Sequence, residues 1–127
     1  MPAVIHLDTN ILVLGLKPGH PVRAKIVRWQ RDGIAFAVSA MAWAEFLCGP
    51  VTSESVRNWD RVLDGVIVPL DRAVAERASV LFNRSGRRPR SLPDCVIAAT
   101  AILQGARLAT LNRRDFEPFR RDGLGFA

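Results

Sequence analysis

Four acidic residues occupy positions at which a carboxylate needs an explanation. Asp8 interrupts a run of apolar residues, Glu45 is the only charge in an apolar stretch, Asp94 comes directly before another apolar stretch, and Asp115 follows a short apolar segment. A buried carboxylate costs free energy unless it is paired or binds a metal ion. The four positions are therefore candidates for a site that does chemistry.

Carboxylates that converge on one spot repel each other unless a divalent cation lies among them. An all-oxygen set of ligands favours Mg²⁺ or Mn²⁺ over zinc. Zinc also lacks support because His6 and His20, the only histidines, have no ligand spacing to Cys48 or Cys95. Magnesium and manganese ions activate water and stabilise the charge that develops on a phosphodiester under attack. The acidic set therefore indicates phosphodiester hydrolysis.

Asp8 and Glu45 also have ordinary structural explanations. Asp8, or Thr9 after it, could cap a helix that begins near Ile11. Glu45 could lie partly exposed on a helix that faces a second copy of the chain. Taken singly, neither carboxylate establishes a site.

Asp94 and Asp115 have alternatives of the same kind. Asp94 stands three residues after Ser91, which is an acidic variant of the capping box, and a helix dipole favours a carboxylate there. Asp115 could form a surface ion pair with Arg113 or Arg114. These explanations stay open, but they do not account for the four acids as a set.

The elements that must position these residues alternate between strand and helix. Apolar, β-branched runs predict strands at 3–7, 34–38, 66–68 and 107–110, with an edge strand near 124–126. Helical spacing, N-caps and Gly or Pro stops predict helices at 21–32, 39–48, 54–63, 71–83 and 91–104. In the helix at 71–83 we expect Ala75, Ala78 and Phe82 to face inward.

Alternating strands and helices predict an α/β fold with a mostly parallel central sheet of four or five strands, covered by helices on both faces. Ligands of such sheets bind beyond the carboxyl ends of the strands. Asp8, Asp94 and the region of Asn112 and Asp115 all fall at that end, and Glu45 lies on a helix entered from another strand. Convergence of the acids at one edge is therefore expected.

The 127-residue chain has a formal net charge of +6, and 16 of its 18 basic residues are arginine. Arginine matches phosphate oxygens, so a polyanionic partner is expected, with a solvated basic face as the alternative. Arg84, Arg87, Arg88 and Arg90 precede Asp94 in a Gly- and Pro-containing loop and are expected to line the entrance to the acidic pocket. A single domain is expected, and the absence of a signal peptide or a ~20-residue apolar run predicts a cytoplasmic protein without membrane contact.

Four segments resemble, in order, those of the PIN-domain ribonucleases, and among them the short VapC-type toxins of bacterial toxin–antitoxin modules. The segments are residues 7–10, 39–46, 93–101 and 108–116. The resemblance covers nearly the whole chain and implies a PIN-like three-layer α/β/α sandwich. It further implies a metal-dependent endoribonuclease that cuts single-stranded or loop RNA, forms a homodimer and is inhibited by a cognate antitoxin.

The resemblance also assigns roles to residues. Asp8, Glu45 and Asp94 would bind Mg²⁺ or Mn²⁺ and carry catalysis. Many relatives have Asp at the fourth acidic position, where this chain has Asn112, so either Asn112 or Asp115 would complete the metal site. The residues expected to steady the first loop or contact RNA are Thr9, Asn10, Arg87, Arg88 and Arg90.

Three other functions fit parts of the pattern. A phosphatase of the haloacid-dehalogenase kind would need a second Asp where this chain has Asn10, and also a later lysine. A signalling receiver domain would likewise need a late lysine, whereas Lys25 is the last one here. A PIN-like protein that binds RNA without cutting it is the third, because Asn112 removes one carboxylate from the site.

Overall fold

The computed structural model describes residues 3–127, and its centre is a five-stranded sheet. The strands are β1 (Val4–Leu7), β2 (Ala35–Ser39), β3 (Ile67–Val68), β4 (Arg107–Ala109) and β5 (Gly125–Phe126). They lie in the order β3-β2-β1-β4-β5, and all neighbours pair in parallel. The chain thus runs outward from β1 to β3 and then crosses back to place β4 on the other side of β1.

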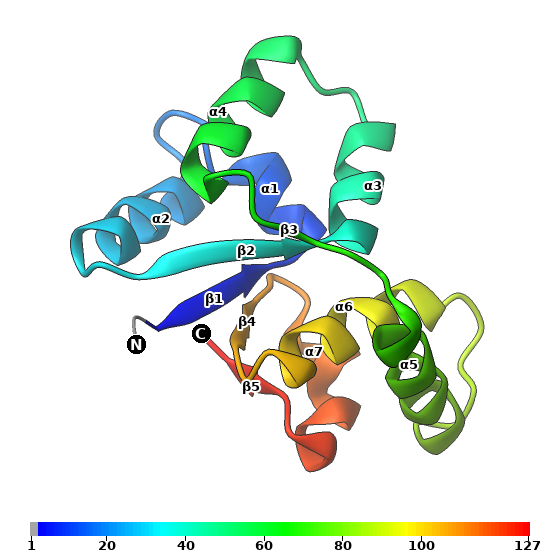
Figure 1. Cartoon of the computed structure of the whole chain (residues 1–127). Helices are drawn as coiled ribbons and strands as arrows, with labels where there is room; N and C mark the ends of the chain where they lie inside the picture. Colours follow the sequence, from blue (N-terminus) through cyan, green and yellow to red (C-terminus); the bar gives the residue numbers. More distant parts are fainter. Residues whose placement is uncertain (1–2) are drawn as a thin grey trace.

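Helices cover both faces of this sheet. They are α1 (Thr9–Leu14), α2 (Pro21–Arg31), α3 (Ala40–Cys48), α4 (Ser53–Leu63), α5 (Arg72–Arg84), α6 (Leu92–Leu103) and α7 (Arg113–Phe116), and a 3₁₀ segment follows at Glu117–Asp122. Figure 1 shows α1, α2 and α4 on one side of the sheet and α5, α6 and α7 on the other. The predicted α/β sandwich is confirmed. No helix of residues 3–127 has both the length and the apolar character needed to cross a membrane.

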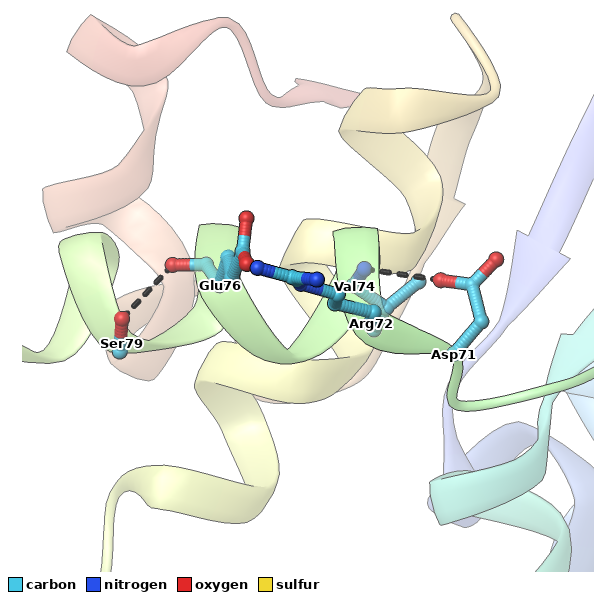
Figure 2. A network of polar contacts seen from close by, with 5 residues as sticks. All are labelled: Asp71, Arg72, Val74, Glu76 and Ser79. Carbon is cyan, nitrogen blue, oxygen red and sulfur yellow. Dashed lines mark hydrogen bonds and ion pairs between the residues drawn. The ribbon is translucent and has the colours of Figure 1, made fainter.

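Side chains at the start of several helices accept hydrogen bonds from backbone N–H groups that have no partner within the helix. Before α3, Ser39 Oγ accepts from the Ala42 N–H at 3.1 Å. Figure 2 shows the same arrangement before α5, where Asp71 Oδ1 accepts from the Val74 N–H at 2.9 Å. Caps of this kind contribute about 1 kcal/mol each. The cap at Ser39 starts α3 directly at the end of β2, which brings the helix to the carboxyl edge of the sheet.

The core joins the helices of one face to each other as well as to the sheet. Trp59 of α4 is fully buried, and its Nε1 donates a hydrogen bond to the Leu12 carbonyl at 2.8 Å. Gly15 ends α1 beside this indole, and a Cβ added there would lie 2.8 Å from the Trp59 ring. Only glycine therefore allows α1 to end against α4 without a shift of the indole.

Some local predictions were wrong. Ser91 does not cap α6: it has φ −88° and ψ −6°, and its Oγ donates to the Arg88 carbonyl at 2.8 Å. The hydroxyl thus closes the preceding loop, and the capping-box interpretation of Asp94 falls away. Ala75 is exposed, because the inward face of α5 is centred one position earlier, on Val74.

By sequence, Trp43, Phe46, Leu47 and the helix expected at 54–63 offer apolar residues for a dimer surface, but the structure places part of this set in the core. Phe46 is 2% exposed, and its ring packs against Trp43 with the ring centroids 5.5 Å apart. The large apolar residues of α4, Trp59 and Leu63, lie in the core of the chain itself. Leu47 of α3 remains 44% exposed.

Candidate functional site

The candidate site lies at the carboxyl ends of β1 and β4, where the direction of the sheet order reverses. Leu7 pairs with Ala109, and the Asp8 N–H donates to the Ala109 carbonyl at 3.0 Å. Asp8 and Thr110 therefore leave the sheet side by side. A crevice at such a reversal is where parallel α/β sheets bind ligands.

Asp8 is held by two hydrogen bonds within this crevice. Its side chain is buried, Oδ1 accepts from the Thr9 N–H at 2.7 Å, and Oδ2 accepts from Thr110 Oγ1 at 2.7 Å. The first contact also caps α1, so the capping alternative and the site interpretation both apply to this carboxylate. Burial raises the pKa of Asp8, and the nearby charges of Glu45 and Asp115 raise it further, against the lowering effect of the two hydrogen bonds.

Glu45 reaches the same place from α3. Thr9 Oγ1 donates to Glu45 Oε1 at 2.8 Å. Since the Thr9 N–H binds Asp8, a single threonine holds one oxygen of each carboxylate. Thr9 was predicted to steady this loop, and the two contacts specify how it would do so. The partly buried Glu45 is thus fixed on the cavity side of α3.

Asp94 stands in the first turn of α6 and faces the other two acids. Its pKa rises from the ordinary value of 3.8 to about 6. Burial is the largest cause, followed by repulsion from Asp8, Asp115 and Glu45, while the positive charge of Arg88 acts in the opposite direction. The four predicted acids are therefore close enough for the other three to raise the pKa of Asp94.

The fourth acidic position, Asn112 or Asp115, lies after β4, in a segment that contacts the start of α1. Asn10 Oδ1 accepts from the Leu111 N–H at 3.2 Å, and the Asn112 N–H donates to Thr110 Oγ1 at 3.0 Å. The first bond ties the segment after β4 to the segment after β1, and the second closes a turn within the segment after β4. Asn112 lines the cavity, whereas Asp115 is exposed on α7 and acts on the site through its charge.

An open cavity of about 400 Å³ gathers these side chains. It is lined by Asp8, Thr9, Asn10, Val13, Leu14, Glu45, Asp94 and Asn112. The polar residues of this list all belong to the set predicted from sequence, and Val13 and Leu14 add an apolar wall from α1. Acids that come from three segments of the chain, 86 positions apart at the extremes, thus share one cavity.

The arginines predicted to line the entrance lie outside the cavity wall. Arg88 is the one tied to the site: its Nη2 donates to the Asp115 carbonyl at 3.0 Å. The Arg87 guanidinium lies 5.3 Å from the centre of the Phe82 ring. Arg90 is exposed and has a positive φ of 65°. Of the loop, only Arg88 lies where it lowers the pKa of an acid of the site.

The donor set fits a divalent cation by its chemistry, because carboxylate and amide oxygens are what Mg²⁺ and Mn²⁺ prefer. The carboxylates of the cavity lie farther apart than the ligands of a closed metal centre. Within residues 3–127 no three His, Cys, Asp or Glu side chains are arranged so that they could hold a metal ion together. Hydrogen bonds from threonines hold one oxygen of Glu45 and both oxygens of Asp8 in this arrangement.

Thr110 is the site residue that the sequence analysis missed. It lies 102 positions from Asp8, to which its hydroxyl donates, so only the pairing of β1 with β4 brings the two together. The available signal was its position at the carboxyl end of the strand predicted at 107–110. A hydroxyl in that place can be a site residue as readily as a turn residue.

Comparisons with known proteins agree with this architecture. The sequence matches the PIN domain family over residues 5–121. It is 31% identical over 120 residues to Ribonuclease VapC10 of Mycobacterium tuberculosis, which covers 93% of this chain and 90% of the relative. A toxin–antitoxin complex from Klebsiella pneumoniae contains a chain that is 27% identical, with a TM-score of 0.64 and coverage of 90% of this chain and 89% of that one.

A further solved structure shares the fold at lower identity. This structure is VapBC2 from Rickettsia felis bound to a DNA fragment from its promoter. The TM-score is 0.73 at 19% identity, and the match covers 98% of this chain and 97% of that one. Together with the family match over nearly the whole chain, these likenesses agree with the parallel sheet covered by helices. The chain belongs to the PIN domain family.

Proposed function

We propose that this protein is a metal-dependent endoribonuclease whose activity is blocked by a protein antitoxin. The observation that carries the proposal is the cavity in which Asp8, Glu45 and Asp94 face each other at the carboxyl edge of the sheet. The similarity to Ribonuclease VapC10 gives the substrate class. The similarity to a chain of a toxin–antitoxin complex gives the class of partner.

In this proposal each residue of the cavity has a distinct task. The Thr9 hydroxyl donates a hydrogen bond to Glu45, and the Thr110 hydroxyl donates one to Asp8. Both carboxylates are therefore already oriented and do not need to reorganise when substrate arrives. Asp94 adds the third carboxylate from the first turn of α6, where burial and the other acids raise its pKa to about 6 in the absence of a divalent cation. Asn10 holds the loop after β4, and with it Asn112, at the edge of the cavity.

The carboxylates Asp8, Glu45 and Asp94, together with Asn112 or Asp115, would hold the Mg²⁺ or Mn²⁺ ion. When bound there, the ion lowers the pKa of water and neutralises the charge that develops on the phosphodiester. The carboxylates in turn have their mutual repulsion relieved, since a cation among them favours their charged forms.

Cleavage of single-stranded RNA with and without the metal tests this proposal. We expect cleavage in Mg²⁺ or Mn²⁺, none in EDTA, and none in folded variants carrying Asp8→Asn, Glu45→Gln or Asp94→Asn. Asp60→Asn, which removes an exposed carboxylate of α4, is the matched control and should cleave like the wild type. Wild-type cleavage by Asp94→Asn would refute the site. Metal-independent RNA binding without cleavage would favour the alternative of a non-catalytic RNA-binding protein.

An antitoxin could block the site through a groove that adjoins it. This groove of about 620 Å³ runs between α1, α3 and α4, and it shares Val13 and Glu45 with the acidic cavity. A segment lying in the groove could place an arginine among the carboxylates, where a charge-assisted bidentate contact is strong. Replacing that arginine in the antitoxin should restore RNA cleavage by the complex.

The proposed assembly is a homodimer that places two acidic cavities along one basic surface. Exposed Leu47 and half-buried Trp43 on α3 supply the apolar surface that remains after Phe46 is assigned to the core. Light scattering at micromolar concentration measures the mass directly. A single species at the chain mass of 14.0 kDa would count against the dimer.

A further inference from the structure

The arginines of the C-terminal half are largely engaged within the chain itself. Ion pairs join Arg84 to Asp122 and Arg120 to Glu117, both at 2.8 Å. Others donate to backbone carbonyls, as Arg88 does to Asp115. A guanidinium whose charge is balanced by a nearby carboxylate, or whose donors are partly used, attracts a phosphate less strongly than a free one. The number of arginines in this half of the sequence is therefore larger than the number of guanidinium groups free to bind a polyanion.

Helix α2 and the loop before it present the opposite situation. Residues 9–31 contain five basic residues and no acidic one. The five are Lys17, Arg23, Lys25, Arg28 and Arg31, all exposed. None of these five side chains forms an ion pair or a hydrogen bond within residues 3–127. Their charges are available to a partner.

Three of these cations surround a hollow in the surface of about 520 Å³. Its wall consists of Gly19, His20, Pro21, Arg23, Ala24, Val27, Arg28 and Arg31, and no carboxylate lies among them. The hollow beside Arg84 differs, because its wall contains Glu117 together with the arginines. Like charges gathered without a counter-charge repel each other and produce a positive potential that attracts anions.

This hollow shares no wall residue with the acidic cavity, but it is linked to a residue that contacts Asp8. A second, smaller hollow of about 220 Å³ has His20 and Pro21 in its wall as well, and it extends to Thr110, whose hydroxyl binds Asp8. Helix α2 runs back along the sheet toward the start of β2 (Figure 1), so His20 lies at its site end and Arg31 at its far end. The α2 cations from Arg23 to Arg31 thus form a path of about 12 Å that begins near the site end of the helix.

We propose that the exposed cations of α2 bind the phosphate backbone of the RNA strand next to the nucleotide in the acidic cavity. This inference rests on the proposed ribonuclease function and adds where the substrate lies. RNA fits because arginine forks match phosphate oxygens and because the path leads to a site suited to phosphodiesters. The RNA-binding surface would then be on α2, with the loop at 84–90 in a secondary role.

The test is the salt dependence of RNA binding, measured by fluorescence anisotropy of a labelled single-stranded RNA in EDTA. The variant is Arg28→Ala with Arg31→Ala. The matched control, Arg72→Ala with Arg107→Ala, removes the same charge from exposed residues that lie outside these hollows; Arg72 is seen beside Glu76 in Figure 2. Because all four side chains are exposed, both variants should fold.

For the α2 variant we expect the slope of log K against log salt to fall by about 1.4, since each lost phosphate contact on a single strand removes about 0.7. Extrapolated from about 1 M to about 0.15 M salt, this corresponds to roughly a tenfold weaker affinity. The control should keep most of the wild-type slope. A further variant, Arg28→Lys with Arg31→Lys, keeps the charge and should retain the slope.

Equal losses in the α2 variant and the control would overturn the inference, because net charge alone would then explain them. An unchanged slope in the α2 variant would also overturn it. Binding in EDTA does not require cleavage, so a protein that fails to cut RNA but shows the α2 effect would refute the proposed catalysis and support the binding surface. A wild-type protein that does not bind RNA would refute both.

Discussion

Replacing Asp94 with Asn should stabilise the folded protein at neutral pH while abolishing its proposed activity. The structure places Asp94 partly buried beside three other acids, and its pKa is raised to about 6. The charged carboxylate is therefore less favourable in the folded chain than in the unfolded one. Asparagine has nearly the same shape and no charge, so it removes this cost.

The size of the effect follows from the pKa. Each pKa unit corresponds to about 1.4 kcal/mol, so a rise from 3.8 to about 6 corresponds to roughly 3 kcal/mol. Against this, Asp94 in the first turn of α6 loses a favourable interaction with the helix dipole, worth about 0.3–1 kcal/mol. The net gain is about 2 kcal/mol. For a chain of 127 residues this raises the melting temperature by about 7 °C.

The raised pKa of Asp94 also determines how the stability difference between wild type and variant changes with pH. Between pH 3.8 and about 6 the folded state binds more protons at Asp94 than the unfolded state does, so the stability of the wild type falls as the pH rises through this range. Below pH 3.8 both states are protonated, and the difference between wild type and variant should nearly vanish. Above about pH 6 the difference should be at its full value.

Thermal unfolding followed by circular dichroism in EDTA, from about pH 4 to about pH 7.5, measures this. Asp32→Asn, an exposed carboxyl at the end of α2, is the control and should track the wild type at every pH. Mg²⁺ should stabilise the wild type more than Asp94→Asn. A ligand that binds only the folded state adds more stability the more tightly it binds, and the variant lacks one of the proposed ligands. A variant that melts at or below the wild-type temperature at pH 7.5 would refute the electrostatic account of the site.

Three further variants test separate parts of the structure. Gly15→Ala should lower the free energy of unfolding, measured by urea denaturation, by about 1–3 kcal/mol, because its Cβ would lie 2.8 Å from the Trp59 ring; an unchanged free energy would mean that the indole moves freely. Thr110→Val should cost about 1.5–3 kcal/mol at pH 7 by removing the hydroxyl from charged Asp8, with a smaller loss at acid pH, and equal losses at both would contradict this role. Asn112→Asp should tighten Mn²⁺ binding in calorimetry and lower the melting temperature without metal; unchanged affinity would exclude this position as a ligand.

The elements could be predicted from the sequence because their signals are local. Apolar runs, helical spacing and the breaks at Gly33 and Gly105 lie within a few residues of the structure they determine. The convergence of the acids followed from the same reasoning, since parallel strands bring their carboxyl ends to one edge. Asp8 and Asp94 therefore share a cavity although their separation in the sequence is large.

What the sequence could not predict depends on pairs of distant side chains. Formal charge gives no indication that Arg84 binds Asp122 within the chain while Arg28 has no such partner among the residues from 3 onward. Charge density alone pointed to the loop at 84–90, where Arg84, Arg87 and Arg88 have partners within the chain, whereas the four exposed cations of α2 have none among residues 3–127. In the same way, Phe46 looked like an interface residue because nothing local distinguishes an apolar side chain that packs inward from one that faces a partner.

Asp8 shows why site and fold are difficult to separate in this protein. The same carboxylate ends the central strand, caps α1 and faces the acidic cavity. Its burial costs free energy, as the raised pKa records, while the Thr9 N–H and the Thr110 hydroxyl offset part of that cost. A strand end and a helix start both need a polar group at this point. The fold therefore holds a carboxylate at its central edge that can also serve chemistry, and the other acids need only be brought to it.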